Sequence, residues 1–253
     1  MIRRTQFVCL LFLYAASVGQ CTQAQDTGQA HSRVRRLSAG VTLGVPLQPA
    51  VRSENLTQSF PTTPPLAIES TNTPKGLSTG YGIAAQVAFA RRFAFAVNPL
   101  IRKVRYTAFT VRYVGTDNPN TPQDERQGTN INEDTEARLL DIPMMIRFYG
   151  RDREEEGHRW FAGIGPVLRY ASKVRTHLTI TPPNQVISED TTPVSYRKRS
   201  LGAVAGFGGQ FVDPLGIRVM PEVRYTRWLD TTFGGVSGLS RRQQIEILIS
   251  LTF

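Results

Sequence analysis

Hydrophobic and polar residues alternate with a period of two in eight segments of the chain. The last segment shows the pattern most clearly, because every second residue is apolar: Ile245, Ile247, Ile249, Leu251 and Phe253. The other seven segments begin near these residues: Leu37, Tyr81, Phe93, Leu140, Trp160, Leu201 and Ile217. Such alternation gives each segment one apolar face and predicts eight β-strands.

The third segment runs from Phe93 to about Tyr113, and its alternation breaks between Pro99 and Arg105. A β-bulge adds one residue to a strand and thereby exchanges its two faces. We therefore expect a bulge in this stretch.

The connections between the segments alternate in length. Long polar stretches cover about Gln48–Gly76, Gly115–Thr135 and Ser172–Ser195, whereas short turns lie at Ala90–Arg92 and Asp213–Pro214. Outer-membrane barrels are connected in this way, with long outer loops and short periplasmic turns. A soluble β-sandwich has no reason to sort its loops by length.

No stretch after residue 24 is long and apolar enough for a transmembrane helix. A chain that crosses a membrane with strands must close them into a barrel, because lipid offers no partner to an open edge. The sequence therefore predicts an all-β fold, a closed antiparallel up-and-down transmembrane β-barrel of eight strands. A soluble, lipocalin-like barrel is the alternative fold.

The second face of the segments carries small residues and scattered charges of both signs. Seven charged residues are predicted to point into the barrel interior: Asp141, Arg147, Arg169, Arg218, Glu222, Arg224 and Glu246. An eight-stranded barrel is just wide enough for side chains, and buried charges must pair. We expect these residues to form a salt-bridge network that fills the interior and leaves no aqueous pore.

Aromatic residues concentrate toward the ends of the segments. Ten of them are candidates for the aromatic girdles at the two membrane interfaces: Tyr81, Phe89, Phe93, Phe148, Tyr149, Trp160, Tyr170, Tyr225, Trp228 and Phe253. The alternative is the general enrichment of aromatic residues in β-strands.

The N-terminus has the pattern of a secretory signal peptide. A basic start at Met1–Arg4 precedes an apolar run at Phe7–Val18, and small residues follow. We expect cleavage between Ala24 and Gln25, with a cut after Gly19 as the alternative. The predicted organisation is a signal peptide at 1–24, an N-terminal tail at 25–35 and an outer-membrane β-barrel domain at 36–253.

Two other export signals fit less well. The flanks of Arg3 and Arg4 differ from a twin-arginine signal, and Gln20 before Cys21 differs from a lipoprotein cleavage site. Cys9 and Cys21 both precede the expected cut, so the mature chain is expected to contain no cysteine and no disulfide.

The net charge of +10 is spread along the chain, with arginines alternating with apolar residues. A nucleic-acid-binding protein gathers its cations on one face, so we expect an anionic membrane surface as the partner and no nucleic acid. Arg197, Lys198 and Arg199 are candidates for contact with lipopolysaccharide phosphates, or else a basic flank of the strand.

An alternating last strand with a terminal Phe resembles the signal that the outer-membrane assembly machinery reads. By that resemblance the recognised residues are Ile247, Ile249, Leu251 and Phe253. Two further motifs, Leu140–Phe148 (LDIPMMIRF) and Gly163–Leu168 (GIGPVL), resemble consecutive strands of the PorT-like outer-membrane β-barrel family. The resemblance implies a small barrel in the outer membrane of a Gram-negative-type bacterium, called porin-like and often without an assigned activity.

Candidate chemistry is sparse, and we expect neither an enzyme nor a cofactor or metal. The histidines after the expected cut are His31, His158 and His177, and only His177 has a serine and an acid nearby in sequence, Ser172 and Glu189. An exposed loop histidine is the favoured interpretation of His177. The acidic stretch from Glu133 through Asp134 and Glu136 to Asp141 lacks the spacing of a calcium loop.

The sequence is compatible with three functions. The favoured one is a monomeric, non-enzymatic barrel with a structural, adhesive or assembly-partner role carried by its outer loops. The second is a narrow porin or an accessory to secretion or transport. The third is an enzyme that modifies outer-membrane lipid, for which His177 is the candidate residue.

Overall fold

The computed structural model describes residues 36–116, 120, 126–152, 158–182, 187–191, 196–213, 216–234 and 240–253. The predicted signal peptide, its cleavage site at Ala24 and Gln25, and the N-terminal tail lie outside the described residues. Within the described ranges no helix is long and apolar enough to span a membrane.

Every alternating segment of the sequence forms antiparallel β-structure. The strands in these segments are β1 (Leu37–Pro46), β4 (Gly80–Ala88), β5 (Phe93–Val97), β6 (Leu100–Val114), β7 (Gln127–Tyr149), β8 (Arg159–Thr181), β10 (Arg199–Val212), β11 (Arg218–Trp228) and β12 (Gln243–Thr252). The predicted all-β, antiparallel architecture is confirmed.

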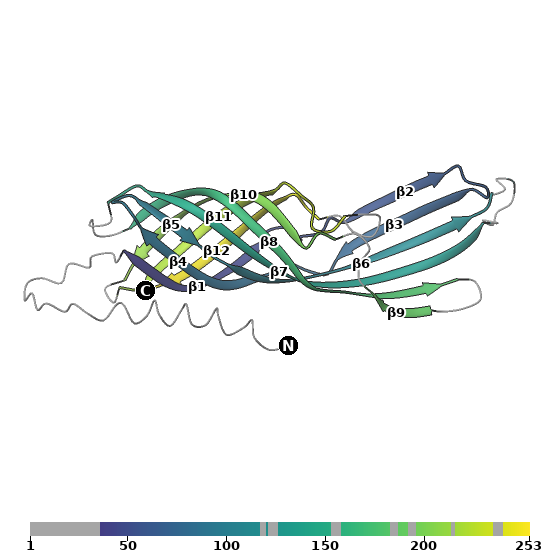
Figure 1. The fold of residues 1–253 in the computed structure, drawn as a ribbon, viewed down its shortest axis with the longest axis horizontal. Coiled ribbons are helices and arrows are strands. Elements are labelled where there is room, and N and C mark those ends of the chain that lie inside the picture. Colours follow the sequence, from purple (N-terminus) through teal and green to yellow (C-terminus); the bar gives the residue numbers. More distant parts are fainter. Residues whose placement is uncertain are drawn as a thin grey trace, which may run out of the picture. The chain divides into compact units, whose positions relative to one another are not determined.

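The strands are paired in a ring of eight (Figure 1). β5 and β6 act as one strand interrupted at Asn98 and Pro99, because both pair with β4 on one side and with β7 on the other. Each ring strand pairs with the next one along the chain. The pairs β7–β8 and β12–β1 complete the circuit. The predicted number of strands and their up-and-down order are therefore correct.

The register of the pairs determines the geometry of the ring. Directly paired residues lead once around it in this order: Leu37, Val87, Phe95, Ile146, Ile164, Ala205, Tyr225, Ile245 and Leu47. The path returns to β1 ten residues beyond its start at Leu37. A shear of ten on eight strands corresponds to a strand tilt of roughly 40–45°. All nine residues on this path are hydrophobic.

The expected bulge near Pro99 is absent, and that prediction was wrong. Phe93 pairs with Phe148 and Leu100 with Asp141, which is the same register on both sides of Pro99. Even-numbered residues from Ala94 to Ala108 all face inward. The apparent break arises because the outward residues change from apolar to charged where the strand leaves the apolar band.

A register shift occurs instead between β7 and β8, at Glu136 and Arg138. Lys173 on β8 has a φ of 51°, a left-handed conformation that is uncommon for a residue with a Cβ atom. The shift lies where these two long strands extend past the ring.

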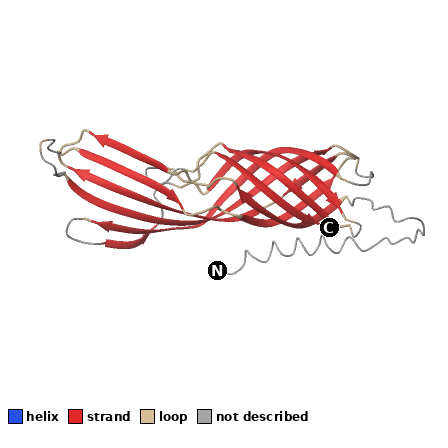
Figure 2. Cartoon of the chain, turned by 180° about the vertical axis from the view of Figure 1, so that it is seen from behind, coloured by secondary structure: helices blue, strands red, loops and turns tan. Residues whose placement is uncertain are grey.

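Beyond the ring, β6, β7 and β8 continue into a second region of sheet together with β2 (Glu54–Phe60), β3 (Leu66–Pro74) and β9 (Ile187–Thr191). Figure 2 shows this second region of sheet beyond the ring. Its strand order is β2-β3-β6-β7-β8-β9. We call this region the outer sheet. The stretches predicted as long loops therefore contain strands. They were missed because β2, β3 and β9 are rich in Thr, Ser and charged residues and lack an apolar face.

The ring carries its apolar side chains on the outside. Outward residues with exposed side chains include Val41, Tyr81, Ile164 and Phe207, each at least 60% exposed. On β1 this band reaches from Leu37 to Leu47, which at about 3.3 Å per residue and this tilt is roughly 24 Å high. The height agrees with the apolar band of outer-membrane barrels.

Candidate functional site

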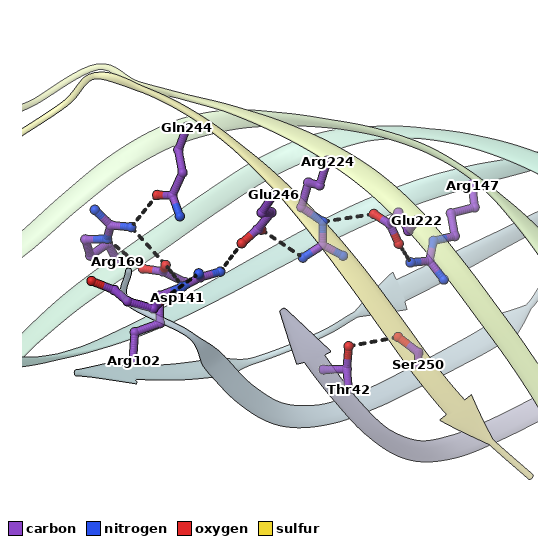
Figure 3. Close-up of polar contacts among 11 residues, drawn as sticks. Thr42, Arg102, Asp141, Arg147, Arg169, Glu222, Arg224, Gln244, Glu246 and Ser250 are labelled. Carbon is purple, nitrogen blue, oxygen red and sulfur yellow. Dashed lines mark hydrogen bonds and ion pairs between the residues drawn. The ribbon is translucent and has the colours of Figure 1, made fainter. Parts of the chain in front are cut away.

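The interior of the ring holds a chain of buried ion pairs, shown in Figure 3. Asp141 on β7 is its first centre. Nε of Arg102 lies 3.0 Å from Oδ2 of Asp141, and Nε and Nη2 of Arg169 lie 2.6 and 2.9 Å from its two oxygens. The side chains of all three residues are at most 6% exposed. One carboxylate thus forms ion pairs with two guanidinium groups, one on each neighbouring strand.

Glu246 on β12 and Glu222 on β11 continue the chain. Arg102 also pairs with Glu246, whose Oε1 lies 3.9 Å from Nη1 of Arg224. Nε of Arg224 donates to Oε1 of Glu222 at 2.9 Å, and Arg147 pairs with the other oxygen of Glu222. Three acids and four arginines from five ring strands are joined in this way (Figure 3). We call these seven residues the interior network.

Aromatic and amide side chains support the network. The guanidinium carbon of Arg169 lies 3.9 Å from the ring centroid of Trp228, and Nη2 of Arg169 donates to Gln244 at 3.2 Å. Tyr149 donates from its hydroxyl to Oε1 of Gln86 at 2.7 Å. Stacking on an aromatic face stabilises a desolvated cation.

The positions of Trp228 and Tyr149 correct the predicted aromatic girdles. Both residues are buried inside the ring, at 3% and 2% exposure. Strict alternation from the outward Phe148 and Tyr225 requires this placement. The other eight candidates lie on the outward face or at its rim: Tyr81, Phe89, Phe93, Phe148, Trp160, Tyr170, Tyr225 and Phe253.

Six of the seven predicted interior charges belong to the interior network: Asp141, Arg147, Arg169, Glu222, Arg224 and Glu246. The seventh, Arg218, is also buried on the inner face, near the start of β11. Arg102 was missed, although it joins two of the acids. Its inward position follows once the register of the third segment is known to be unbroken.

Side chains fill the space around the network. A cavity of about 10 Å³ beside Arg224 and Glu246 has room for roughly one water molecule. At the outer end of the ring, Val51 and Phe233 pack against Val104, Tyr106 and Leu139 in an apolar cluster. The interior is therefore packed, with a polar centre and an apolar layer at its outer end.

Tyr106 lies in this outer apolar layer, with its ring centroid 5.5 Å from that of Phe233. Burial raises the pKa of Tyr106 to about 12, although a hydrogen bond with Thr135 acts in the opposite direction. The neutral phenol is thus the form that the folded protein favours.

Charged residues also gather outside, on the outer sheet. Lys103 Nζ lies 2.7 Å and Arg105 Nε 3.2 Å from Glu136, and Lys75 Nζ lies 2.6 Å from Asp134. The hydrogen bond from Lys103 and the nearby positive charges lower the pKa of Glu136. A cleft of about 360 Å³ is lined by four of these side chains, Lys75, Arg105, Asp134 and Glu136, together with others.

His177 lies at the same cleft, on β8, and its neighbours differ from the predicted ones. Nδ1 lies 2.9 Å from Oδ1 of Asp190, and Nε2 lies 3.1 Å from Oγ of Ser188. Ser172 and Glu189 do not take part in these contacts. The order Ser, His, Asp matches that of a hydrolytic triad. The side chains of His177 and Asp190 are 58% and 89% exposed, so water competes for both hydrogen bonds.

The remaining candidates are dispersed. His158 is exposed, and the centroid of its imidazole lies 4.9 Å from that of the Phe211 side chain. His31 lies outside the described residues. Asp141 is inside the ring, whereas Asp134 and Glu136 are on the outer sheet. Among the residues that the structure describes, no group of three His, Cys, Asp or Glu side chains is arranged to hold a metal ion.

No protein-family model and no curated protein matches the sequence. Solved structures that resemble this chain include the following two. The outer membrane protein OprG from Pseudomonas aeruginosa has 10% identity and a TM-score of 0.46, over 85% of this chain and 92% of that one. Ail, the attachment invasion locus protein of Yersinia pestis, has 8% identity and a TM-score of 0.28, over 87% of this chain and 100% of that one.

Proposed function

We propose that this chain is an integral outer-membrane β-barrel whose interior is closed and whose outer sheet forms its working surface. The role is structural, adhesive or that of an assembly partner, without chemistry of its own. The observation that carries the proposal is the inversion of polarity in the ring, with charges inside and an apolar band outside.

Ion pairs such as Arg147 with Glu222 are buried inside the ring, whereas Ile164 and Phe207 are 68% and 60% exposed. A soluble barrel buries its apolar side chains and exposes its polar side chains to water. A continuous apolar belt around a water-exposed monomer is rare and promotes aggregation. In a membrane the belt contacts lipid instead of water, so it does not promote aggregation. Each strand of the ring is paired on both sides, as strands in lipid must be. The lipocalin-like alternative needs the opposite arrangement.

The outer sheet supports a binding role. Its outermost strands, β2 and β9, each pair on one side alone in the described part of the chain. All five residues of β9 and most of β2 are exposed. An open strand edge offers backbone donors and acceptors to an extended segment of another protein.

The other functions have weaker support. The packed interior disfavours a porin, although a transport accessory could work without conduction. A lipid-modifying enzyme is supported by the contacts of His177 with Ser188 and Asp190, but their exposure disfavours catalysis. The proposal also includes membership of the PorT-like family. It further includes recognition by the outer-membrane assembly machinery of four residues, Ile247, Ile249, Leu251 and Phe253. All four lie on the outward face and are at least 40% exposed.

Single cysteines test the location and the outer surface together. The mature chain is expected to lack cysteine, so Ile164→Cys and Thr57→Cys each introduce one reactive thiol. On intact cells a membrane-impermeant maleimide should label Thr57→Cys on β2 and leave Ile164→Cys unlabelled until the protein is denatured. Equal labelling of both residues in the folded protein would contradict insertion in a membrane.

The adhesive role is tested at the edge of the outer sheet. A lysine on an edge strand disfavours pairing with a further strand. Thr57→Lys should reduce attachment of expressing cells to protein-coated surfaces, whereas Thr57→Ser should not. Unchanged attachment of cells that carry equal amounts of both variants would argue against a role for this edge.

A further inference from the structure

Cations follow the apolar band on one side of the ring. On β6 the last outward apolar residue is Ile101, and the next outward residue is Lys103. On β7 Leu140 is followed in the same way by Arg138, and on β10 Leu201 is followed by Arg199. All three cations are exposed. A positive charge thus lies one step beyond the band on each of these strands.

The strand between β7 and β10 adds a fourth cation. Lys173 on β8 is exposed and follows Ser172, which pairs directly with Arg138. Its φ of 51° accompanies the register shift of β8. A bulge of this kind changes the direction of the side chain that it carries. Lys103, Arg138, Lys173 and Arg199 therefore lie on four consecutive ring strands, and we call them the basic rim.

The other strands of the ring differ. Gln243 on β12 and Thr79, just before β4, are neutral, whereas Arg227 on β11 is a further exposed cation. The cations are therefore concentrated on the side of the ring from β6 to β11. Three of the four residues of the basic rim lie on β6, β7 and β8, the strands that continue into the outer sheet.

The described residues supply little negative charge to the basic rim. Lys103 shares Glu136 with Arg105, so one acid serves two cations. Among the described residues, no acid forms an ion pair with Arg138, Lys173 or Arg199. Lys103 and Arg138 are moreover direct partners across β6 and β7. Like charges opposite one another on a sheet are destabilising unless an anion lies between them.

We propose that the basic rim binds the phosphate groups of lipid headgroups in the leaflet that contacts the long-loop end of the ring. This inference rests on the proposed membrane location. Headgroup phosphates begin where the apolar band ends, at the level of these four residues. Arginine and lysine bind phosphate through charge-assisted hydrogen bonds. The expected ligand is the phosphate of a lipid headgroup. Binding of free inorganic phosphate is a separate outcome of the test.

The test uses the folded mature protein in micelles of a nonionic detergent. The probe is lipid A with both phosphates, compared with the same lipid after removal of its phosphates and with inorganic phosphate. The test variant is Arg138→Gln, Lys173→Gln and Arg199→Gln combined. The control removes three exposed arginines from the opposite end of the ring, with Arg36→Gln, Arg91→Gln and Arg151→Gln combined.

The phosphorylated lipid should bind the unchanged protein and the control equally. The test variant should bind it about 100-fold more weakly, since each cation near an anionic surface contributes a several-fold gain. Arg138→Lys with Arg199→Lys should retain most of the affinity. A gel assay for the folded barrel keeps a folding defect apart from a binding defect.

Three results would overturn the inference. They are equal binding of the lipid without phosphates, equal losses in the test variant and the control, and competition by inorganic phosphate at the concentration of the lipid. Each leaves the barrel in the membrane. If the purified chain stays soluble without detergent, that result contradicts the proposed function itself.

Discussion

Arg169 on β8 donates two hydrogen bonds to Asp141, its direct partner across the sheet on β7, at 2.6 and 2.9 Å. The same carboxylate accepts a third hydrogen bond from Arg102 at 3.0 Å. The three groups are buried, so each depends on the others for its charge to be compensated. This arrangement makes Asp141 the most informative single position in the interior.

Replacing Asp141 with Asn should lower the free energy of unfolding by about 3–5 kcal/mol, because it leaves two buried guanidinium groups without their shared anion. Urea titration of the folded barrel in detergent measures the change. The matched control is Asp152→Asn, which removes a partly exposed carboxylate 2.5 Å from the half-exposed Arg92 and should change stability by less than about 1 kcal/mol. Similar effects of the two substitutions would contradict the buried interior network.

A closed interior should carry no ionic current. The interior network and the apolar layer around Val51 and Phe233 fill the interior, and the cavity beside Arg224 and Glu246 measures about 10 Å³. The purified protein in planar lipid bilayers should therefore show no reproducible single-channel steps at neutral pH. Steps of uniform size that scale with protein concentration would show that the interior conducts.

Close approach of strands leaves no room for a Cβ atom at several glycines, and Gly165 is one of them. A Cβ atom at Gly165 would lie 1.9 Å from the carbonyl oxygen of Met144 on β7, and backbone cannot move away cheaply. Gly165→Ala should destabilise the barrel by about 1–3 kcal/mol or prevent its folding. Gly44→Ala is the control, since its nearest neighbour is a Leu248 side-chain atom at 3.6 Å. Equal unfolding midpoints would refute the close packing at Gly165.

Tyr106 predicts a loss of stability at alkaline pH. Its pKa is raised to about 12 in the folded protein, from 10 for an ordinary phenol. The folded state therefore favours the neutral form, and this contribution is complete below pH 10 and declines as the pH rises from 10 to 12. Tyr106→Phe should remove that part of the decline in unfolding experiments over this range. An identical pH dependence for the variant would place the phenol in water.

The sequence predicted the ring well because lipid and interior impose a strict period of two. The outward positions of seven segments, from Leu37 on β1 to Phe253 after β12, follow from it, and the third segment follows it as far as Pro99. The same rule would have placed Tyr149 and Trp228 inside, since each lies an odd number of residues from an outward neighbour. The alternation therefore indicates the facing side of these residues better than their aromatic character does.

The outer sheet and Arg102 were not predictable in the same way. Beyond the membrane neither face of a strand meets lipid, so β2, β3 and β9 have no apolar period. On β6 the polarity of both faces changes near Arg102, with Leu100 and Val104 inside and Lys103 outside. A change of surroundings and a change of register produce the same pattern in a single sequence, and only strand pairing distinguishes them.

Migration of the membrane fraction on a denaturing gel, with and without boiling, tests the membrane-barrel account most directly. A ring of eight strands with complete backbone pairing resists detergent and remains compact until it is heated. The protein should therefore be found in the outer-membrane fraction and migrate faster before boiling than after it. Recovery in the soluble fraction, with a single band at the same position in both lanes, would contradict the account.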